Sequence, residues 1–234
     1  MPRQLSQQDE ALTSRGAKQP VWDVPIRLFH WTLAGLIGFS WWSAKNDHID
    51  WHLYSGFGIL SLLIFRLLWG LFGSSTARFS NFVRGPSGVL AYLRDHSSWK
   101  AAGHTPLGAL SVVALLGAVL VQVSLGLFAT DEDGLNEGPL AHWISIDASE
   151  QVRDVHELWF KVVLGLIVLH VAAILYYRLF RNKRLTKAMI TGTNRLEPGV
   201  APMRPGKYWV ALLCLVAGIA TTRWIIAGLP PLGG

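Results

Sequence analysis

Five long apolar blocks constrain the fold of this chain more than any other feature of its sequence. Each block is about 20 residues long, the length that an α-helix needs to cross roughly 30 Å of hydrocarbon. The blocks cover Ile26–Trp42, Leu53–Phe72, Leu107–Phe128, Leu158–Leu179 and Tyr208–Leu229. Backbone polar groups inside lipid must be satisfied within their own segment, so blocks of this length are helices. The sequence therefore predicts an all-α membrane protein with five transmembrane helices.

The charged residues are few and lie between the blocks. Only 15% of the residues are charged, against about a quarter in a soluble domain. Segment 73–106 carries four basic residues and one acidic residue, and segment 180–207 carries seven basic residues and one acidic residue. Segment 129–154 has the opposite balance, with seven acidic residues and one basic residue. The positive-inside rule places the N-terminus and the two basic loops in the cytoplasm, and the acidic loop and the C-terminus outside. The net charge of +6 therefore indicates topology, and we expect no nucleic-acid partner.

Four histidines lie in or at the ends of the apolar blocks. His30 is near the start of the first block and His52 opens the second. His156 is at the outer end of the fourth block and His170 is in its inner half. The last two are fourteen residues apart, which is about 40° from full helical register and roughly 21 Å along the axis. Both rings therefore project from one face of one helix, one near each leaflet.

The predicted topology places these four histidines at two depths in the membrane. The first block starts inside, so His30 lies near the inner leaflet with His170. The second block starts outside, so His52 lies near the outer leaflet with His156. The sequence thus predicts two pairs on different helices, His30 with His170 and His52 with His156.

Two facing imidazoles inside a helical bundle can bind an iron porphyrin from both sides. Small residues, Ala34 and Gly56, follow His30 and His52 by one helical turn and leave room for a flat cofactor. Two other interpretations remain open: hydrogen bonds between helices, and a path for a metal ion or proton. A transport path would normally include intramembrane Asp or Glu, and none lies in the middle of a block. The single cysteine, Cys214, is not in a haem-attachment motif, so a haem would be bound non-covalently.

Four stretches of the chain resemble the bacterial cytochrome b561 family and the related b-type subunits of nickel–iron hydrogenases. They read VWDVPIRLFHWTLAG, HLYSGFGILSLLIFRLLWG, GHTPLGALSVVALLGAVLVQVSLGLF and VHELWFKVVLGLIVLHVAA. The resemblance covers Val21–Thr191 and includes all four histidine contexts in order. It implies a four-helix transmembrane core with two b haems, held by His30, His52, His156 and His170.

The resemblance and the apolar blocks divide the chain into three segments. Residues 1–20 are expected to be a mobile cytoplasmic tail, residues 21–191 the di-haem four-helix domain, and residues 192–234 a linker with a fifth transmembrane helix. Arg27 and Arg66 lie near the inner ends of the first two blocks, where they could bind haem propionates or extend to lipid phosphate. His104 precedes the third block and could contact a propionate or a quinone head group, or only occupy the interface.

The resemblance implies electron transfer between the quinone pool and a redox partner, in a multi-pass protein of the bacterial inner membrane. The partner would be a periplasmic c-type cytochrome or a dehydrogenase subunit. One alternative is a membrane-anchor cytochrome of a hydrogenase or other dehydrogenase. The other, from a different class, is a metal or proton transporter that uses the intramembrane histidines. The sequence leaves open whether the chain is an electron-transfer protein or an oxidoreductase subunit.

Overall fold

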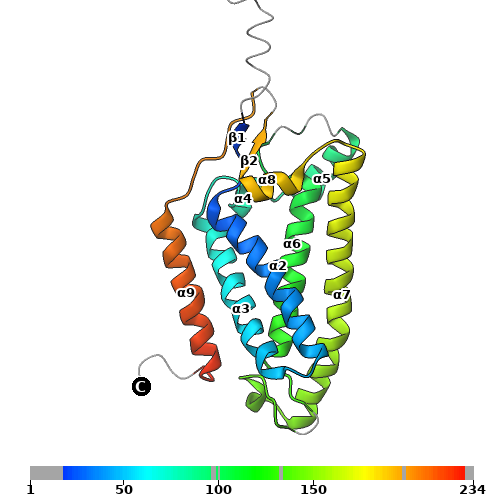
Figure 1. Ribbon diagram of the computed structural model, residues 1–234, viewed down its shortest axis with the longest axis vertical. Coiled ribbons are helices and arrows are strands. Elements are labelled where there is room, and N and C mark those ends of the chain that lie inside the picture. Colours follow the sequence, from blue (N-terminus) through cyan, green and yellow to red (C-terminus); the bar gives the residue numbers. More distant parts are fainter. Residues whose placement is uncertain (1–17, 96–98, 100, 132–133, 197–198, 230–234) are drawn as a thin grey trace, which may run out of the picture.

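The computed structural model describes residues 18–229 except 96–98, 100, 132–133 and 197–198. Its long helices run side by side as a bundle (Figure 1). They are α2 (Val24–Lys45), α3 (Ile49–Phe72), α6 (Pro106–Gly126), α7 (Ile146–Leu179) and α9 (Tyr208–Ile226). Among the described residues, α3, α6, α7 and α9 are long and apolar enough to cross a membrane. The 22-residue α2 is long enough, at about 33 Å, but less apolar.

Polar residues at the boundaries of the apolar blocks begin the long helices. The Asp23 carboxylate accepts from the Ile26 amide at 2.7 Å and starts α2. The Thr105 hydroxyl accepts from the Gly108 amide at 3.1 Å and starts α6. Such N-caps satisfy amides that have no partner within the helix. Ser145 caps α7 in the same way, thirteen residues before the fourth apolar block begins. α7 therefore extends well beyond its apolar part.

Four of the long helices form two helical hairpins that contact each other between α3 and α6. α2 packs along α3, α6 packs along α7, and the hairpins join between α3 and α6, whereas α2 and α7 do not pack closely along each other. An apolar cluster fills the centre between the hairpins. Its buried members are Ile59, Leu63, Ala118, Val119 and Val163, with Leu33, Leu36 and Ile37 of α2 packed against them. We call this group the central cluster.

Short elements cover one end of the bundle, which we call the strand end (Figure 1). They are β1 (Lys18–Pro20), α4 (Phe79–Phe82), α5 (Pro86–Arg94), α8 (Leu185–Thr191) and β2 (Thr193–Arg195). β1 and β2 pair antiparallel. The Pro20 carbonyl accepts from the Met203 amide at 3.0 Å, which ties the linker before α9 to the same sheet. Residues 18–20 of the expected tail are thus part of the strand end, and residues 1–17 lie outside the described residues.

The opposite end, which we call the loop end, carries the α6–α7 connection and the end of α9 (Figure 1). Within that connection, η2 (Ala141–Trp143) is a single 3-10 turn. The Asp131 carboxylate accepts from the Leu135 amide at 2.8 Å and from the Asn136 side chain at 2.6 Å. The Asn136 hydrogen bonds lower the pKa of Asp131. These hydrogen bonds connect Asp131 with Leu135 and Asn136.

The C-terminal helix α9 packs against α3 through small residues. Ala211, Cys214, Gly218 and Thr222 are buried on this face. A Cβ at Gly218 would lie 2.6 Å from the Ser61 carbonyl oxygen of α3. Only glycine allows this approach, because a main-chain oxygen cannot move aside as a side chain can. The Ser61 and Thr222 hydroxyls are 2.9 Å apart and hydrogen-bonded.

Candidate functional site

The loop-end pair of histidines, His52 of α3 and His156 of α7, faces across the bundle. Their ring centroids are 6.0 Å apart and the rings are perpendicular. A metal–imidazole bond of about 2 Å puts a metal roughly 3 Å from the ring centroid. A metal ion half-way between these two rings would therefore have suitable distances to both. The structure brings together the two residues that the depth argument paired.

Hydrogen bonds fix the protonation of both rings in the loop-end pair. His52 Nδ1 lies 2.9 Å from the Ser40 carbonyl oxygen, and His156 Nδ1 lies 2.9 Å from the Gln122 carbonyl oxygen. A carbonyl only accepts, so Nδ1 carries the proton in each ring. This leaves Nε2 with the lone pair in both histidines, the tautomer of a metal-ligating imidazole whose other nitrogen is oriented by its surroundings.

Two neighbours shape the space around this pair. The Gln122 side-chain amide donates to His156 Nε2 at 3.0 Å, so it occupies the lone pair that a metal would take. A Cβ at Gly126 would lie 3.0 Å from His156 Cε1, whereas the Cβ position of Gly56, one turn after His52, has no heavy atom within 4 Å. The ring of His156 is therefore held closely on the α6 side, and there is room beside His52.

The strand-end pair consists of His30 of α2 and His170 of α7. α2 begins and α7 ends at the strand end (Figure 1), so His30, six residues into α2, and His170, nine residues before the end of α7, lie at similar depths. His170 Nδ1 lies 3.3 Å from the Ser111 hydroxyl, while His30 Nδ1 is enclosed without a hydrogen-bond partner. An enclosed imidazole nitrogen without a partner is costly, and a bound cofactor would remove that cost.

The central cluster separates the two histidine pairs. Val163 of α7 lies half-way between His156 and His170 in sequence, and only 1% of its surface is exposed. In the part of the chain that the structure describes, no three His, Cys, Asp or Glu side chains gather as a metal site. Histidines in pairs suit a metal that brings its remaining ligands with it, as iron does in a porphyrin. The residues present therefore fit two haems at different depths.

The two arginines predicted from the sequence both lie at the strand end. Only 1% of the Arg66 surface is exposed. Its Nη1 donates to the Ala77 carbonyl at 3.2 Å, its guanidinium carbon is 4.5 Å from the Phe79 ring centroid, and its Nη2 is enclosed without a partner. Arg27 donates to the Ile190 carbonyl through Nη2, and its Nε is enclosed without a partner.

His104 lies at the strand end, just before α6. Its ring packs between Trp22 and Phe82, with both centroid distances 4.6 Å. Burial, with the nearby positive charges of Arg66 and His170, lowers the pKa of His104 to about 3. The imidazole is therefore neutral at physiological pH.

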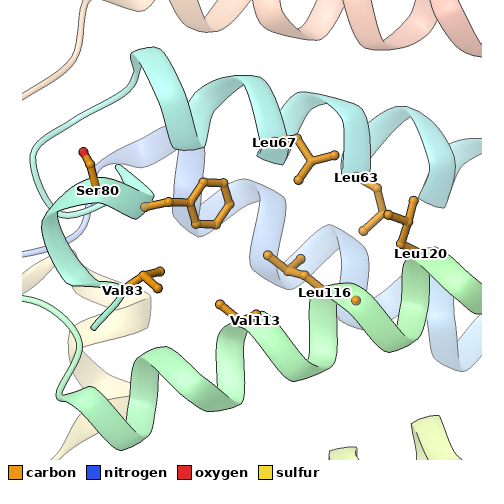
Figure 2. Close-up of a pocket in the computed structure, with 9 residues that line it drawn as sticks. Leu63, Leu67, Ser80, Val83, Val113, Leu116 and Leu120 are labelled. Atoms are coloured by element: carbon orange, nitrogen blue, oxygen red, sulfur yellow. The ribbon is translucent and has the colours of Figure 1, made fainter. Parts of the chain in front are cut away.

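An apolar groove of about 590 Å³ runs along the bundle between α3, α4 and α6. Figure 2 shows Leu63 and Leu67 of α3 facing Val113 and Leu116 of α6, with Ser80 of α4 at one end. The full lining consists of Leu63, Leu67, Phe79, Ser80, Val83, Val113, Leu116, Gly117 and Leu120. The groove matches an apolar chain better than a polar ligand.

The fold and the histidine pairs together define a class, the polytopic helical membrane proteins with cofactor-binding histidines inside the bundle. The protein-family model described as prokaryotic cytochrome b561 matches residues 21–192, and the chain belongs to this family. Neither the curated proteins nor the solved structures gave a match to the chain. The chain is therefore a membrane protein of the b-type cytochrome class, which carries electrons across membranes by means of haem.

Several residues of the site were not predicted from the sequence. Ser40 and Ser111 hydrogen-bond to histidines of other helices, and Gly126 sets the position of His156. Gln122 hydrogen-bonds to His156 through its side-chain amide and its backbone carbonyl. These contacts depend on the register between neighbouring helices, and the spacing within one helix does not contain that information.

Proposed function

We propose that the chain binds two haem b groups non-covalently, each between two histidines. His52 and His156 hold one at the loop end, and His30 and His170 hold the other at the strand end. The single observation that carries this proposal is the loop-end pair, whose ring centroids are 6.0 Å apart and whose Nδ1 atoms are protonated, which leaves Nε2 as the nitrogen that can bind iron. Haem binding would displace the Gln122 amide from His156 Nε2. A bound haem supplies one-electron redox chemistry at its iron.

Transmembrane electron transfer is the function that two haem sites at two depths support. The ligands His156 and His170 are roughly 21 Å apart along α7, and the central cluster between them excludes water. An apolar, rigid interior favours fast electron transfer because little solvent has to reorganise. The chain's own contribution is to set the distance between the two sites and to keep that gap dry.

The spectrum of the purified protein tests the haem proposal. We expect a reduced-minus-oxidised difference spectrum with a b-type α-band and a haem content of two per chain. A content of one would contradict the second site. A colourless protein with bound zinc, or one that moves protons without haem, would instead support the transporter alternative.

We also propose that the chain exchanges electrons with the membrane quinone pool and that the groove between α3, α4 and α6 receives the quinone's isoprenoid tail. Its apolar lining and its volume of about 590 Å³ support this occupant. The groove borders Leu116, which packs against the central cluster, so a quinone there would be separated from the haem space by one layer of side chains.

Filling the groove tests the quinone proposal. The Cβ position of Gly117 has no heavy atom within 4 Å, so Gly117→Leu fills the groove without a clash. We expect quinol-dependent reduction of the haems to slow about tenfold, while chemical reduction by dithionite stays unchanged. Gly165→Leu on α7 is the matched control, because the Cβ position of Gly165 is equally open and does not line the groove. Equal quinol rates in the two variants would exclude this groove.

The orientation and the partners complete the proposal. The strand end is cytoplasmic and the loop end periplasmic in a five-span protein of the bacterial inner membrane, since the basic segments gather at the strand end. The redox partner is a periplasmic c-type cytochrome or a dehydrogenase subunit. The acidic α6–α7 connection supports a basic partner at the loop end, and its docking would weaken as ionic strength rises.

A further inference from the structure

A continuous row of rings joins a buried cation to an enclosed histidine at the strand end. The ring centroids of Trp22 and His104 are 4.6 Å apart, those of His104 and Phe82 4.6 Å, and those of Phe82 and Phe79 5.7 Å. The Phe79 ring centroid is 4.5 Å from the Arg66 guanidinium carbon. Packing thus fixes the positions of both polar groups, Arg66 and His104, at the inner ends of α3 and α6.

Each of these two groups has an enclosed nitrogen that finds no hydrogen-bond partner among the residues that the structure describes. These nitrogens are Arg66 Nη2 and His104 Nδ1. Buried polar atoms are nearly always paired in folded proteins, and an exception calls for an explanation. The two unpaired nitrogens belong to side chains at the two ends of the Phe79–Phe82 ring pair. They are therefore suited to share one ligand.

The charge of Arg66 also lacks a direct partner in the described part of the chain. The nearest acid that interacts with it is Asp23. Both oxygens of Asp23 are already engaged, one by the Ile26 amide at 2.7 Å and the other by the Trp69 indole N–H at 3.1 Å. A buried guanidinium without a carboxylate is costly, so an anionic ligand would complete this site. A guanidinium and an imidazole N–H both donate well to a carboxylate.

We propose that Arg66 and His104 bind one propionate carboxylate of the strand-end haem. The proposal rests on the proposed function, because it needs a haem between His30 and His170. His104 lies seven residues before Ser111, whose hydroxyl is 3.3 Å from His170 Nδ1, so this site lies roughly 10 Å along the bundle from the strand-end pair. A lipid phosphate is a poorer occupant, because only 1% of the Arg66 surface is exposed and the Phe79 ring covers the guanidinium.

Redox titration of the two haems tests this proposal. Three variants are compared: His104→Gln, Arg66→Lys and Arg66→Gln. Arg66→Lys keeps the positive charge but changes the hydrogen-bond geometry, whereas Arg66→Gln removes the charge. A cation and a donor at the propionate stabilise the reduced haem, which carries one more negative charge. We expect the redox potential of the strand-end haem to become more negative in His104→Gln and Arg66→Gln. The shift in Arg66→Lys should have the same sign but be smaller. We also expect the strand-end haem to dissociate about tenfold faster, as the loss of a charge-assisted hydrogen bond predicts.

The loop-end transition is the internal control for folding, and it should stay unchanged in all three variants. His142→Gln at the loop end and Arg94→Gln at the strand end are matched controls, since both side chains are exposed. Unchanged strand-end potential and retention would overturn the proposal, as would equal shifts of both transitions or loss of both haems. Absence of haem from the unaltered protein would instead overturn the proposed function.

Discussion

The four histidines differ in their hydrogen-bond partners, so substitutions at the two sites should differ in their effects. His156 has three hydrogen-bonding contacts with Gln122 of α6, through both ring nitrogens and its own carbonyl. His30 has an enclosed nitrogen without a partner. The loop-end site is thus largely formed by the protein alone. The strand-end site has more unsatisfied polar atoms and should depend more on its cofactor for stability.

Histidine substitutions test the pairing directly. If each pair holds one haem, removal of either histidine would weaken the same site, so His30→Ala and His170→Ala should alter the same redox transition. His52→Ala and His156→Ala should alter the other one. A double variant within a pair should lose little more haem than a single variant, because the effects of residues that act as a unit are not additive. Haem content and potentiometric titration of each variant provide the measurement.

The cross-pair double variant is the control for the pairing. His30→Ala with His52→Ala should lose both transitions, since each substitution removes a ligand from a different site. If His30→Ala and His156→Ala instead removed the same transition, the pairing and the depth argument behind it would be wrong.

Gly126 offers a second prediction at the scale of one residue. An added methyl would lie 3.0 Å from His156 Cε1 and 3.3 Å from Nδ1, so Gly126→Ala should displace the ring and lengthen its hydrogen bond to the Gln122 carbonyl. Overpacking of this kind costs about 1–3 kcal/mol. We expect a changed low-spin ferric signal for the loop-end haem in electron paramagnetic resonance spectra. The strand-end signal should not change, and Gly165→Ala, at an open position, should change neither.

At the scale of the helices, much of the bundle could be predicted from the sequence. The apolar blocks located the long helices because only a helix satisfies its own backbone in lipid. They did not predict the three extra turns at the start of α7, because that segment is polar and its helix begins at the Ser145 cap. The short α4, α5 and α8 and the β1–β2 pair were missed for a related reason. Their structure comes from packing on the strand end, and no hydropathy period marks them.

Val163 lies at the centre of α7 and connects the two hairpins through the central cluster. Val163→Leu keeps the site apolar and adds one methylene, so both haems should be retained with at most a modest loss of stability. Val163→Asp places a charge in the middle of the bundle, at a cost of about 2.5–3.5 kcal/mol, and should disrupt haem binding. Haem content after purification distinguishes the two variants. Full retention of both haems in Val163→Asp would show that this face does not pack between the sites.

The docking of α9 on α3 gives a prediction for an element outside the matched family region. Gly218→Leu cannot be accommodated, since its Cβ would lie 2.6 Å from the Ser61 carbonyl oxygen, so α9 should move away from α3. Cys214 is the single cysteine of the chain and is buried on this face. We expect its labelling by a membrane-permeant maleimide to increase at least several-fold in Gly218→Leu. The haem spectrum should persist, because residues 21–192 contain all four histidines.

Slow labelling of Cys214 in Gly218→Leu, as in the unaltered protein, would mean that the helix pair adjusts without separating. Gly165→Leu is again the control variant, since its added side chain meets no heavy atom near its Cβ. Its labelling should match that of the unaltered protein.

For the whole molecule, the strand end and the loop end differ in both structure and charge. At the strand end, β1, β2 and the linker before α9 are joined by backbone hydrogen bonds from segments far apart in the sequence. The basic segments 73–106 and 180–207 contribute to this end, and the acidic segment 129–154 contributes to the other. The charge pattern could be predicted from the sequence, whereas the pairing of residues 18–20 with residues 193–195 could not, because it joins two short polar segments without a turn between them.

The orientation of the chain follows from this asymmetry and is the last prediction. β1 and the end of α9 lie at opposite ends of the bundle (Figure 1), as the proposed five crossings would require. Basic loops remain in the cytoplasm, so the strand end should face the cytoplasm and the C-terminus the periplasm. Alkaline phosphatase fused after Gly234 should be active, and a fluorescent protein that folds only in the cytoplasm should be dark there. Fusions after Gly199, between α8 and α9, should give the reverse result. Cytoplasmic activity after Gly234 would show that α9 does not cross the membrane or that another helix fails to span it.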